Sequence, residues 1–158
     1  MPPEPTYFIY RTPLGRITIA SNGTAITHVL FGEQEAPGKL APSALTNEAA
    51  TQIQQYLAGK RRTFDLPLAP EGTAFQQSVW KALREIPYGQ TWTYRQLAEA
   101  VGNPKAYRAV GGANNRNPLP IIVPCHRVIG ADGGLVGYAS GTHIKRFLLD
   151  LEAEHANG

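Results

Sequence analysis

The chain has 158 residues, of which 42% are hydrophobic, and fifteen Lys and Arg against twelve Asp and Glu give it a net charge of +3. This length is enough for one large domain or two small ones, and the charge permits contact with a polyanion without requiring it. The single cysteine excludes an internal disulfide and a multi-cysteine zinc site, and no apolar run approaches the roughly 18 residues of a membrane span, so we expect a cytoplasmic protein with no membrane partner.

The first seventy residues predict a small α/β domain. Three short runs rich in β-branched and aromatic residues (7–11, 16–20 and 25–31) are separated by turn sequences, of which Asn22-Gly23 is the strongest, so we expect an antiparallel meander. Residues 32–42 have the composition of a loop. Apolar residues then recur at helical spacing from Thr46 to Leu57, with Gly59 as a stop signal, and residues 64–68 are a candidate further strand.

Prolines and a glycine near residue 70 mark a boundary, which predicts an N-terminal domain over 1–70 and a C-terminal domain over 71–158. The second domain is expected to be mainly helical. Thr73 and Gln76 have the spacing of a capping box at the start of its first helix. The apolar stripe of this helix is expected to contain Phe75, Val79, Leu83 and Ile86.

Residues 93–101, a turn at 102–104 and a second helix ending near Asn114 have the spacing of a helix-turn-helix, although many such hairpins bind no DNA. An exposed Gly111-Gly112 pair costs about 1 kcal/mol per residue against alanine, which suggests that a partner approaches the backbone closely. Alternatively, the two glycines only end the helix early. Helical geometry places Ala106, Ala109, Val110 and Ala113 on one face and Arg108, Gly111, Gly112 and Asn115 on the other.

The only cysteine, Cys125, is followed directly by His126 and Arg127. A thiol reacts as its thiolate, and a neighbouring imidazole and guanidinium lower its pKa, so we expect a thiolate at neutral pH. The alternative is a small buried hydrophobe. The last helix has an apolar stripe of Ile144, Phe147, Leu148 and Leu151, followed at its edge by Glu152, a carboxylate that needs a cationic partner so near a helix C-terminus.

The run Pro124-Cys125-His126-Arg127-Val128, with Asn117-Pro118 before it, resembles the active-site signature of the O6-alkylguanine-DNA alkyltransferases. The likeness extends from about Phe75 to Glu152 and includes Arg108-Ala109-Val110-Gly111-Gly112-Ala113. It implies a ribonuclease H-like N-terminal domain and a winged-helix-like C-terminal domain. The implied activity is that of a single-turnover methylated-DNA–protein-cysteine methyltransferase, which repairs double-stranded DNA by moving the alkyl group of O6-alkylguanine to its own cysteine.

The resemblance also implies the roles of individual residues. Cys125 is the acceptor, His126 acts as a base through a bound water, and Glu152 orients His126. Tyr94 meets the guanine ring, and Asn117 fixes the active-site turn. The base pocket is formed by Tyr94, Val128, Tyr138, Ala139 and Ser140. DNA contacts are expected from Thr93, Gln96, Ala106, Tyr107, Arg108, Ala109, Gly111, Gly112 and Asn115, with Arg108 taking the place of the flipped nucleotide in the minor groove.

The sequence departs from the family pattern at Tyr107, where relatives often have a small residue. No metal or organic cofactor is implied, a monomer in solution is expected, and activity on O4-methylthymine stays open. Two alternatives remain at this point. One is a helix-turn-helix regulator with a structural cysteine, and the other is a Cys-His-Glu hydrolase of small acyl substrates.

Overall fold

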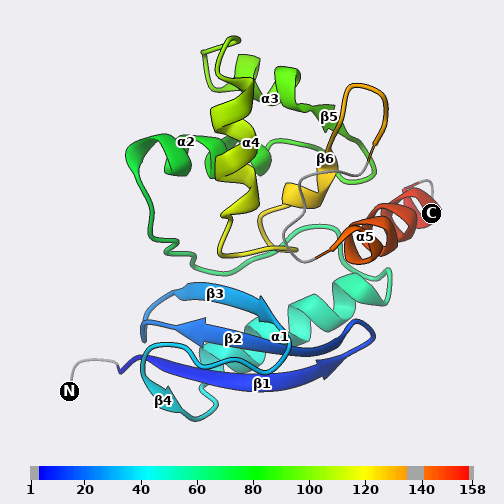
Figure 1. The fold of residues 1–158 in the computed structure, drawn as a ribbon. Helices are drawn as coiled ribbons and strands as arrows, with labels where there is room; N and C mark the ends of the chain where they lie inside the picture. Colours follow the sequence, from blue (N-terminus) through cyan, green and yellow to red (C-terminus); the bar gives the residue numbers. More distant parts are fainter. Residues whose placement is uncertain (1–3, 135–140, 157–158) are drawn as a thin grey trace. The chain divides into compact units, whose positions relative to one another are not determined.

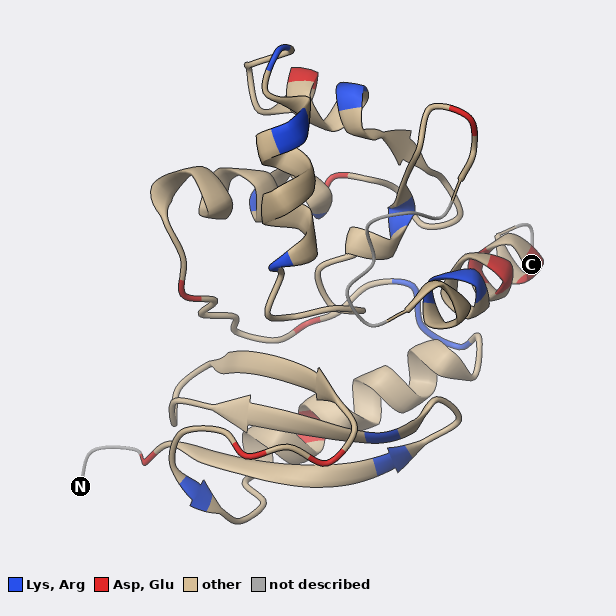
Figure 2. Cartoon of the chain, in the orientation of Figure 1, with Lys and Arg blue, Asp and Glu red and all other residues tan. Residues whose placement is uncertain are grey.

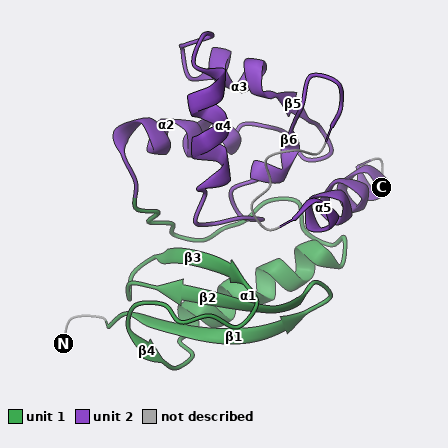
Figure 3. Cartoon of the chain, viewed as in Figure 1, with its two compact units in different colours: residues 1–71 green, residues 72–158 purple. Residues whose placement is uncertain are grey.

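The structure is a computed structural model that describes residues 4–134 and 141–156. The chain divides into two compact units, residues 1–71 and residues 72–158 (Figure 3). In the part of the chain that the structure describes, no helix is both long and apolar enough to cross a membrane.

The first unit is built on a small sheet with the strand order β3-β2-β1-β4 (Figure 1). The strands β1 (Thr6–Thr12), β2 (Gly15–Ser21) and β3 (Ile26–Phe31) pair antiparallel, which confirms the predicted meander. The turn before β3 forms as predicted, because the Asn22 side chain accepts the backbone N–H groups of Thr24 and Ala25 and Gly23 has φ 103°.

Two details of this sheet differ from the sequence prediction. Within the expected loop, β4 (Lys39–Leu40) pairs parallel with β1, so the sheet is mixed and not purely antiparallel. The expected strand over 64–68 is reduced to one parallel bridge between Ile26 and Leu68. The prolines on either side of Leu68 explain this reduction, because a proline has no N–H group to extend a ladder of hydrogen bonds.

One helix, α1 (Ala44–Leu57), packs on β1, β2 and β3. It begins two residues earlier than predicted, because Ser43 caps it in a capping box with Thr46. Its apolar face is fully buried at the predicted spacing. Gly59 follows the helix with φ 75°, the left-handed conformation that the stop signal predicted. The buried residues of α1 are Thr46, Ala49, Ala50, Gln52, Ile53, Tyr56 and Leu57.

The second unit is mainly helical. Three helices, α2 (Ala74–Leu83), α3 (Tyr94–Ala100) and α4 (Tyr107–Asn115), pack against one another. The capping box of Thr73 and Gln76 is confirmed, and a third box of the same kind, Thr93 with Gln96, starts α3. The strands β5 (Trp92–Thr93) and β6 (Val128–Ile129) form a parallel pair, and α5 (Thr142–His155) packs on the short 3-10 helix η1 (Cys125–Arg127).

Several positions on the predicted helical stripes were wrong. Phe75 and Phe147 are 36% and 38% exposed, and Ala109 is exposed as well. Polar residues take the buried places instead, with Asn114 1% exposed on α4 and Lys145 fully buried on α5. Prediction from hydrophobic periodicity assumes that the buried face of a helix is apolar. It therefore fails where buried polar residues are satisfied by hydrogen bonds.

Candidate active site

The segment before and around the cysteine is buried without interruption from Ile121 to Val128. Asn117 fixes its course, because its side-chain amide donates to the carbonyl of Val123 at 2.8 Å and its oxygen accepts the N–H of Leu119 at 3.0 Å. Ile121 has φ 76°, a left-handed conformation that is rare for a β-branched residue and costs on the order of 1–3 kcal/mol. The surrounding hydrogen bonds therefore hold the turn in a strained shape.

Cys125 opens η1 and is 5% exposed. Its carbonyl accepts the backbone N–H of Val128 and, at 3.5 Å, the side-chain amide of Asn114. Asn114 belongs to α4, so a buried polar contact joins this helix to the peptide of the cysteine. Sequence reasoning missed Asn114, although it lies four residues after Val110 on the buried face of α4.

His126 and Glu152 lie next to each other in the interior. The Nε2 atom of His126 is 2.7 Å from Oε2 of Glu152, and the two residues are 0% and 1% exposed. The η1 helix supplies the imidazole and α5 supplies the carboxylate, across 26 positions of sequence. The pair that the family resemblance implied is therefore in contact.

Arg127 also binds this carboxylate. Its Nε and Nη2 atoms donate to Oε1 and Oε2 of Glu152 at 2.8 and 2.9 Å, and its Nη1 atom donates to the carbonyl of Ile86 at 2.7 Å. The guanidinium lies 5.6 Å from the ring centre of Tyr88, and the N–H of Gly89 donates to Oε1 of Glu152 at 3.0 Å. Glu152 is thus held by three neighbours, a geometry that allows a buried carboxylate to stay ionised.

These contacts determine the protonation of the pair. Burial alone would raise the pKa of Glu152, but the hydrogen bonds from His126 and Arg127 lower it to about 2. Burial lowers the pKa of His126, against the opposing effect of the Glu152 carboxylate. An ionised carboxylate can only accept, so Nε2 of the neutral imidazole carries the proton and Nδ1 carries the lone pair. His126 is therefore prepared to take a proton on Nδ1.

The prediction that Cys125 is a thiolate at neutral pH is wrong for the free protein. Burial raises the pKa of the Cys125 thiol to about 11, and the side chain of Asn117 and the charge of Lys145 only partly oppose this effect. Arg127, which we expected to lower the thiol pKa, is instead engaged by Glu152 and Ile86. The sulfur is therefore protonated at neutral pH, because a dry surrounding disfavours its charged form.

Lys145 is the cation that acts on the thiol, and sequence reasoning missed it. Its ammonium is buried and donates to the carbonyl of Val128. Burial lowers the pKa of Lys145, and electrostatic attraction to negative charge on Cys125 opposes this effect. The sequence did contain a pattern that places Lys145 on the buried face. The helical spacing (i, i+3, i+7) puts it on the same face of α5 as Leu148 and Glu152, the face that packs on η1.

Tyr94 starts α3 and is half-buried. A Cβ placed on Gly111 would lie 3.6 Å from the Tyr94 ring, so this ring is next to α4 at that glycine. Burial raises the pKa of the Tyr94 hydroxyl, and the neighbouring Cys125 raises it further. Tyr94 therefore lies within electrostatic reach of the thiol and contacts the helix with the Gly-Gly pair.

The residues expected at the DNA interface lie on or beside α3 and α4. Gly112 has open space where a side chain would stand, and Arg108, Ala109 and Asn115 are exposed next to it. Thr93 and Gln96 bond each other in the cap of α3 at 2.8 and 3.2 Å, and Gln96 is exposed. Ala106 is the residue before α4 and makes no side-chain cap, and Tyr107 is 44% exposed.

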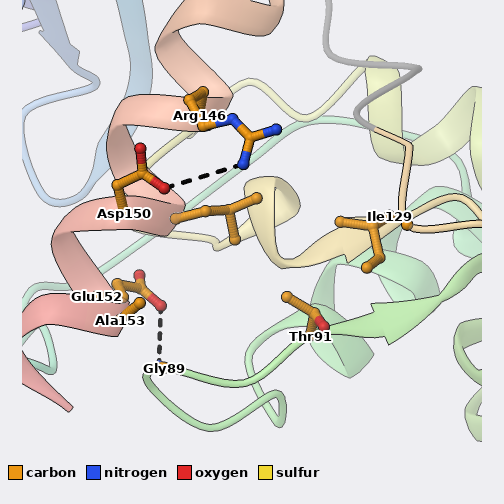
Figure 4. Close-up of a pocket in the computed structure, with 9 residues that line it drawn as sticks. Gly89, Thr91, Ile129, Arg146, Asp150, Glu152 and Ala153 are labelled. Carbon is orange, nitrogen blue, oxygen red and sulfur yellow. Dashed lines mark hydrogen bonds and ion pairs between the residues drawn. The ribbon is translucent and has the colours of Figure 1, made fainter.

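A pocket of about 260 Å³ opens beside Glu152. Figure 4 shows Arg146 and Asp150 of α5 on one side and Thr91 and Ile129 on the other. Neither Cys125 nor Tyr94 lines it, so this pocket is not the access route to the sulfur. Three residues of the expected base pocket, Tyr138, Ala139 and Ser140, lie outside the described residues.

Among residues 4–134 and 141–156, no group of three or more His, Cys, Asp and Glu side chains is placed to hold a metal ion. The titratable side chains of the described site are one thiol, one neutral imidazole, one ionised carboxylate and two buried cations.

Comparison with known families covers nearly the whole chain. Residues 74–154 match the DNA binding domain of 6-O-methylguanine DNA methyltransferase, and residues 6–70 match the ribonuclease-like domain of the same enzyme. The chain belongs to this family. The match to the C-terminal domain includes every residue of the site described above, from Ile86 to Glu152.

Individual relatives agree with this assignment. The chain is 54% identical over 151 residues to a methylated-DNA–protein-cysteine methyltransferase of Methanosarcina barkeri, with 92% of this chain and 96% of the relative covered. A constitutive enzyme of the same name from Bacillus subtilis is 49% identical, with 92% and 94% covered. The crystal structure of a Mycobacterium tuberculosis O6-methylguanine methyltransferase is 43% identical, with 98% and 96% covered and a TM-score of 0.89. A crystal structure of the M. tuberculosis protein in complex with DNA has a TM-score of 0.88, with 95% and 94% covered.

Proposed function

We propose that this protein repairs double-stranded DNA by transferring the alkyl group of O6-alkylguanine to the sulfur of Cys125. The observation that carries the proposal is the buried contact between His126 and Glu152, with Cys125 directly before His126 in a segment matched by the family. The transfer forms a thioether and releases an unmodified guanine. Because a thioether is a poor leaving group and the chain has no second cysteine, each molecule acts once.

The DNA-binding element is the pair α3 and α4, which we interpret as the helix-turn-helix of a winged-helix-like domain. The two helices are in contact and joined by a short turn in which Gly102 has φ 85°. The open position at Gly112, beside the exposed Arg108, supports close approach of a groove to α4. A target base must leave the stack to reach a buried thiol, and Arg108 is the long side chain that fills the vacated place.

The chemical step needs a base for the thiol proton. Nδ1 of His126 takes this proton through a bound water, while Glu152 holds the imidazole through Nε2 and stabilises its charged form. The sulfur then forms a bond with the alkyl carbon as the bond from that carbon to O6 breaks. The electron pair of the broken bond stays on the guanine, which takes a proton from the neighbouring Tyr94 hydroxyl, and the proton held by His126 returns to Tyr94 through solvent.

Activation of the thiol is coupled to substrate binding in this proposal. The free thiol has a pKa of about 11, so few molecules carry a thiolate at neutral pH. The bound base places an electrophilic carbon next to the sulfur, and proton transfer to His126 then accompanies bond formation. Lys145 favours this step, because its charge stabilises negative charge on the sulfur.

Recognition of guanine uses fixed backbone groups. The carbonyl of Val128 would accept the exocyclic amine, which distinguishes guanine from adenine, and Lys145 holds this carbonyl in place. Asn117 keeps the turn before Cys125 in shape. The remaining walls are assigned to Tyr138, Ala139 and Ser140. For the N-terminal unit we propose a ribonuclease H-like fold, and for the whole protein a reducing, cytoplasmic location that keeps Cys125 as a thiol.

A helix-turn-helix regulator is the main alternative. It would use α3 and α4 to read one operator sequence and would treat Cys125 as structural. It gives no reason for the ordered contacts among His126, Arg127 and Glu152, which a structural cysteine does not need. A hydrolase of small acyl substrates would use the same three groups but would turn over repeatedly and would need no DNA.

Intact-protein mass spectrometry after incubation with a duplex that contains O6-methylguanine tests the proposal. We expect a gain of one methylene unit per molecule, located on Cys125, and none with an unmodified duplex. Cys125→Ala should gain nothing while still binding DNA. Unchanged mass together with tight binding of one unmodified sequence would favour the regulator, and many turnovers of an acyl ester would favour the hydrolase.

A further inference from the structure

One exposed aromatic side chain stands at the start of α4. Tyr107 is the first residue of the helix and is 44% exposed, next to Arg108, which is also exposed. Tyrosine usually buries its ring in the folded protein or in an interface, because the ring is large and apolar apart from its hydroxyl. The exposed ring of Tyr107 is therefore available to contact a binding partner.

Helical geometry places Tyr107 relative to the two glycines of α4. Residues four positions apart lie one above the other on a helix, so Tyr107 stands one turn before Gly111 and Arg108 one turn before Gly112. The ring of Tyr94 is 3.6 Å from the place of a Gly111 side chain, whereas Gly112 is open. Tyr107 thus lies on the Tyr94 side of the exposed face, and Arg108 lies on the open side.

The charge around this ring suits a polyanion. α4 contains no acidic residue, and Lys105, Arg108 and Arg116 are exposed before, on and just after it. Figure 2 shows this as blue segments at both ends of α4 with no red between them. Exposed aromatic side chains interleaved with cations are the usual means of binding splayed or unstacked bases.

We propose that Tyr107 stacks on the nucleotide next to the one that is flipped, and so holds the distorted duplex open while Arg108 fills the gap. This inference rests on the proposed function and adds to it a contact that positions the duplex. The stacking surface is the aromatic ring, not the hydroxyl. The contact is made only in duplex DNA, so it contributes nothing to the reaction with a free base.

The test compares Tyr107→Ala and Tyr107→Phe with the unchanged protein on two substrates, a duplex with O6-methylguanine and free O6-benzylguanine. We expect Tyr107→Ala to lower the second-order rate constant on the duplex by about fivefold or more. The rate with O6-benzylguanine should stay within a factor of about two, and Tyr107→Phe should behave like the unchanged protein. Phe75→Ala removes a similarly exposed aromatic residue on α2; it is the matched control and should change neither rate.

A second readout follows stacking directly. With 2-aminopurine placed beside the lesion, binding of the unchanged protein should quench the fluorescence more than binding of Tyr107→Ala does. Equal quenching, an unchanged or faster duplex reaction in Tyr107→Ala, or an equal loss in Tyr107→Phe would overturn the inference. If the unchanged protein reacts with both substrates, these outcomes remove only the role of Tyr107. If it reacts with neither, the proposed function itself fails.

Discussion

Arg127 and Glu152 form a buried two-point ion pair, in which both oxygens of the carboxylate accept from one guanidinium, at 2.8 and 2.9 Å. The same two oxygens also accept from Gly89 and bond His126. One carboxylate on α5 therefore joins the loop after α2 to the helix η1 that carries the cysteine. The ion pair stabilises the structure of the site, whereas the neighbouring imidazole of His126 is the proposed base.

Removal of Arg127 should strongly destabilise the protein. In Arg127→Ala the Glu152 carboxylate loses two donors in a dry environment, which costs about 3–5 kcal/mol when one partner of a buried pair is deleted. The free energy of unfolding from urea denaturation measures this loss. Arg146→Ala is the matched control, because Arg146 and Asp150 are 4.0 Å apart and 62% and 68% exposed. It should change the stability by less than about 1 kcal/mol, and an equal effect of both changes would contradict the buried pair.

The stability of the fold should fall in acid because of Glu152. Its pKa is about 2 in the folded protein against an ordinary value of 4.5, so the unfolded chain takes up the proton first. The resulting stabilisation, on the order of 3 kcal/mol, is complete above pH 4.5 and is lost as the pH falls towards 2. The lowered pKa of His126 acts in the same direction at higher pH. Urea denaturation from pH 7 to 3 should show this decline, with a smaller decline between pH 4.5 and 3 in Glu152→Gln.

Alkylation of Cys125 by a small reagent should depend steeply on pH in the free protein. With a thiol pKa near 11, the thiolate fraction rises about tenfold per pH unit across the neutral range. The rate of iodoacetamide labelling, followed by mass spectrometry from pH 6 to 10, should still rise at pH 10. A plateau below pH 8 would mean that the free protein already holds a thiolate.

Lys145→Met should make the thiol still harder to ionise. The charge of Lys145 lowers the thiol pKa, so a neutral side chain of similar length should move the labelling profile of Cys125 to higher pH. The transfer rate on methylated duplex should fall by about tenfold or more at neutral pH, because the Val128 carbonyl also loses its donor. If the pH dependence of labelling did not shift, Lys145 would act only through the Val128 carbonyl.

Arg108→Ala should separate base flipping from chemistry. Arg108 is exposed on α4 and makes no contact with the Cys125 segment among the described hydrogen bonds and ion pairs. We expect a loss of at least tenfold in the reaction with duplex DNA and little change with free O6-benzylguanine. Equal losses on both substrates would remove Arg108 from the flipping role.

The elements were predictable from the sequence where local signals determine them. The capping box at Thr73, the turn at Asn22-Gly23 and the stop at Gly59 depend on neighbouring residues, and all three formed as predicted. The strand β4 was missed because two residues of parallel pairing leave no periodic pattern. The exposed Phe75 was misplaced because it lies in the first turn of its helix, where burial depends on what packs there and not on spacing.

The site was predictable in its contacts but not in its electrostatics. The residues Cys125, His126 and Glu152 were named from a resemblance, and the structure brings His126 and Glu152 together. The charge state of the thiol depends on burial, which adjacency in sequence does not reveal. The cation beside the thiol is therefore Lys145, which is 20 residues from Cys125 in the chain, whereas the adjacent Arg127 is turned towards α5.

The burial of the Cys125 sulfur has a consequence for a protein that is spent by its own reaction. A buried, protonated cysteine, 5% exposed as a residue, reacts slowly with peroxides, disulfides and other electrophiles. Each molecule thereby retains an unmodified acceptor cysteine through long periods without damaged DNA. Side reactions of the thiol should therefore consume few molecules before they meet a lesion.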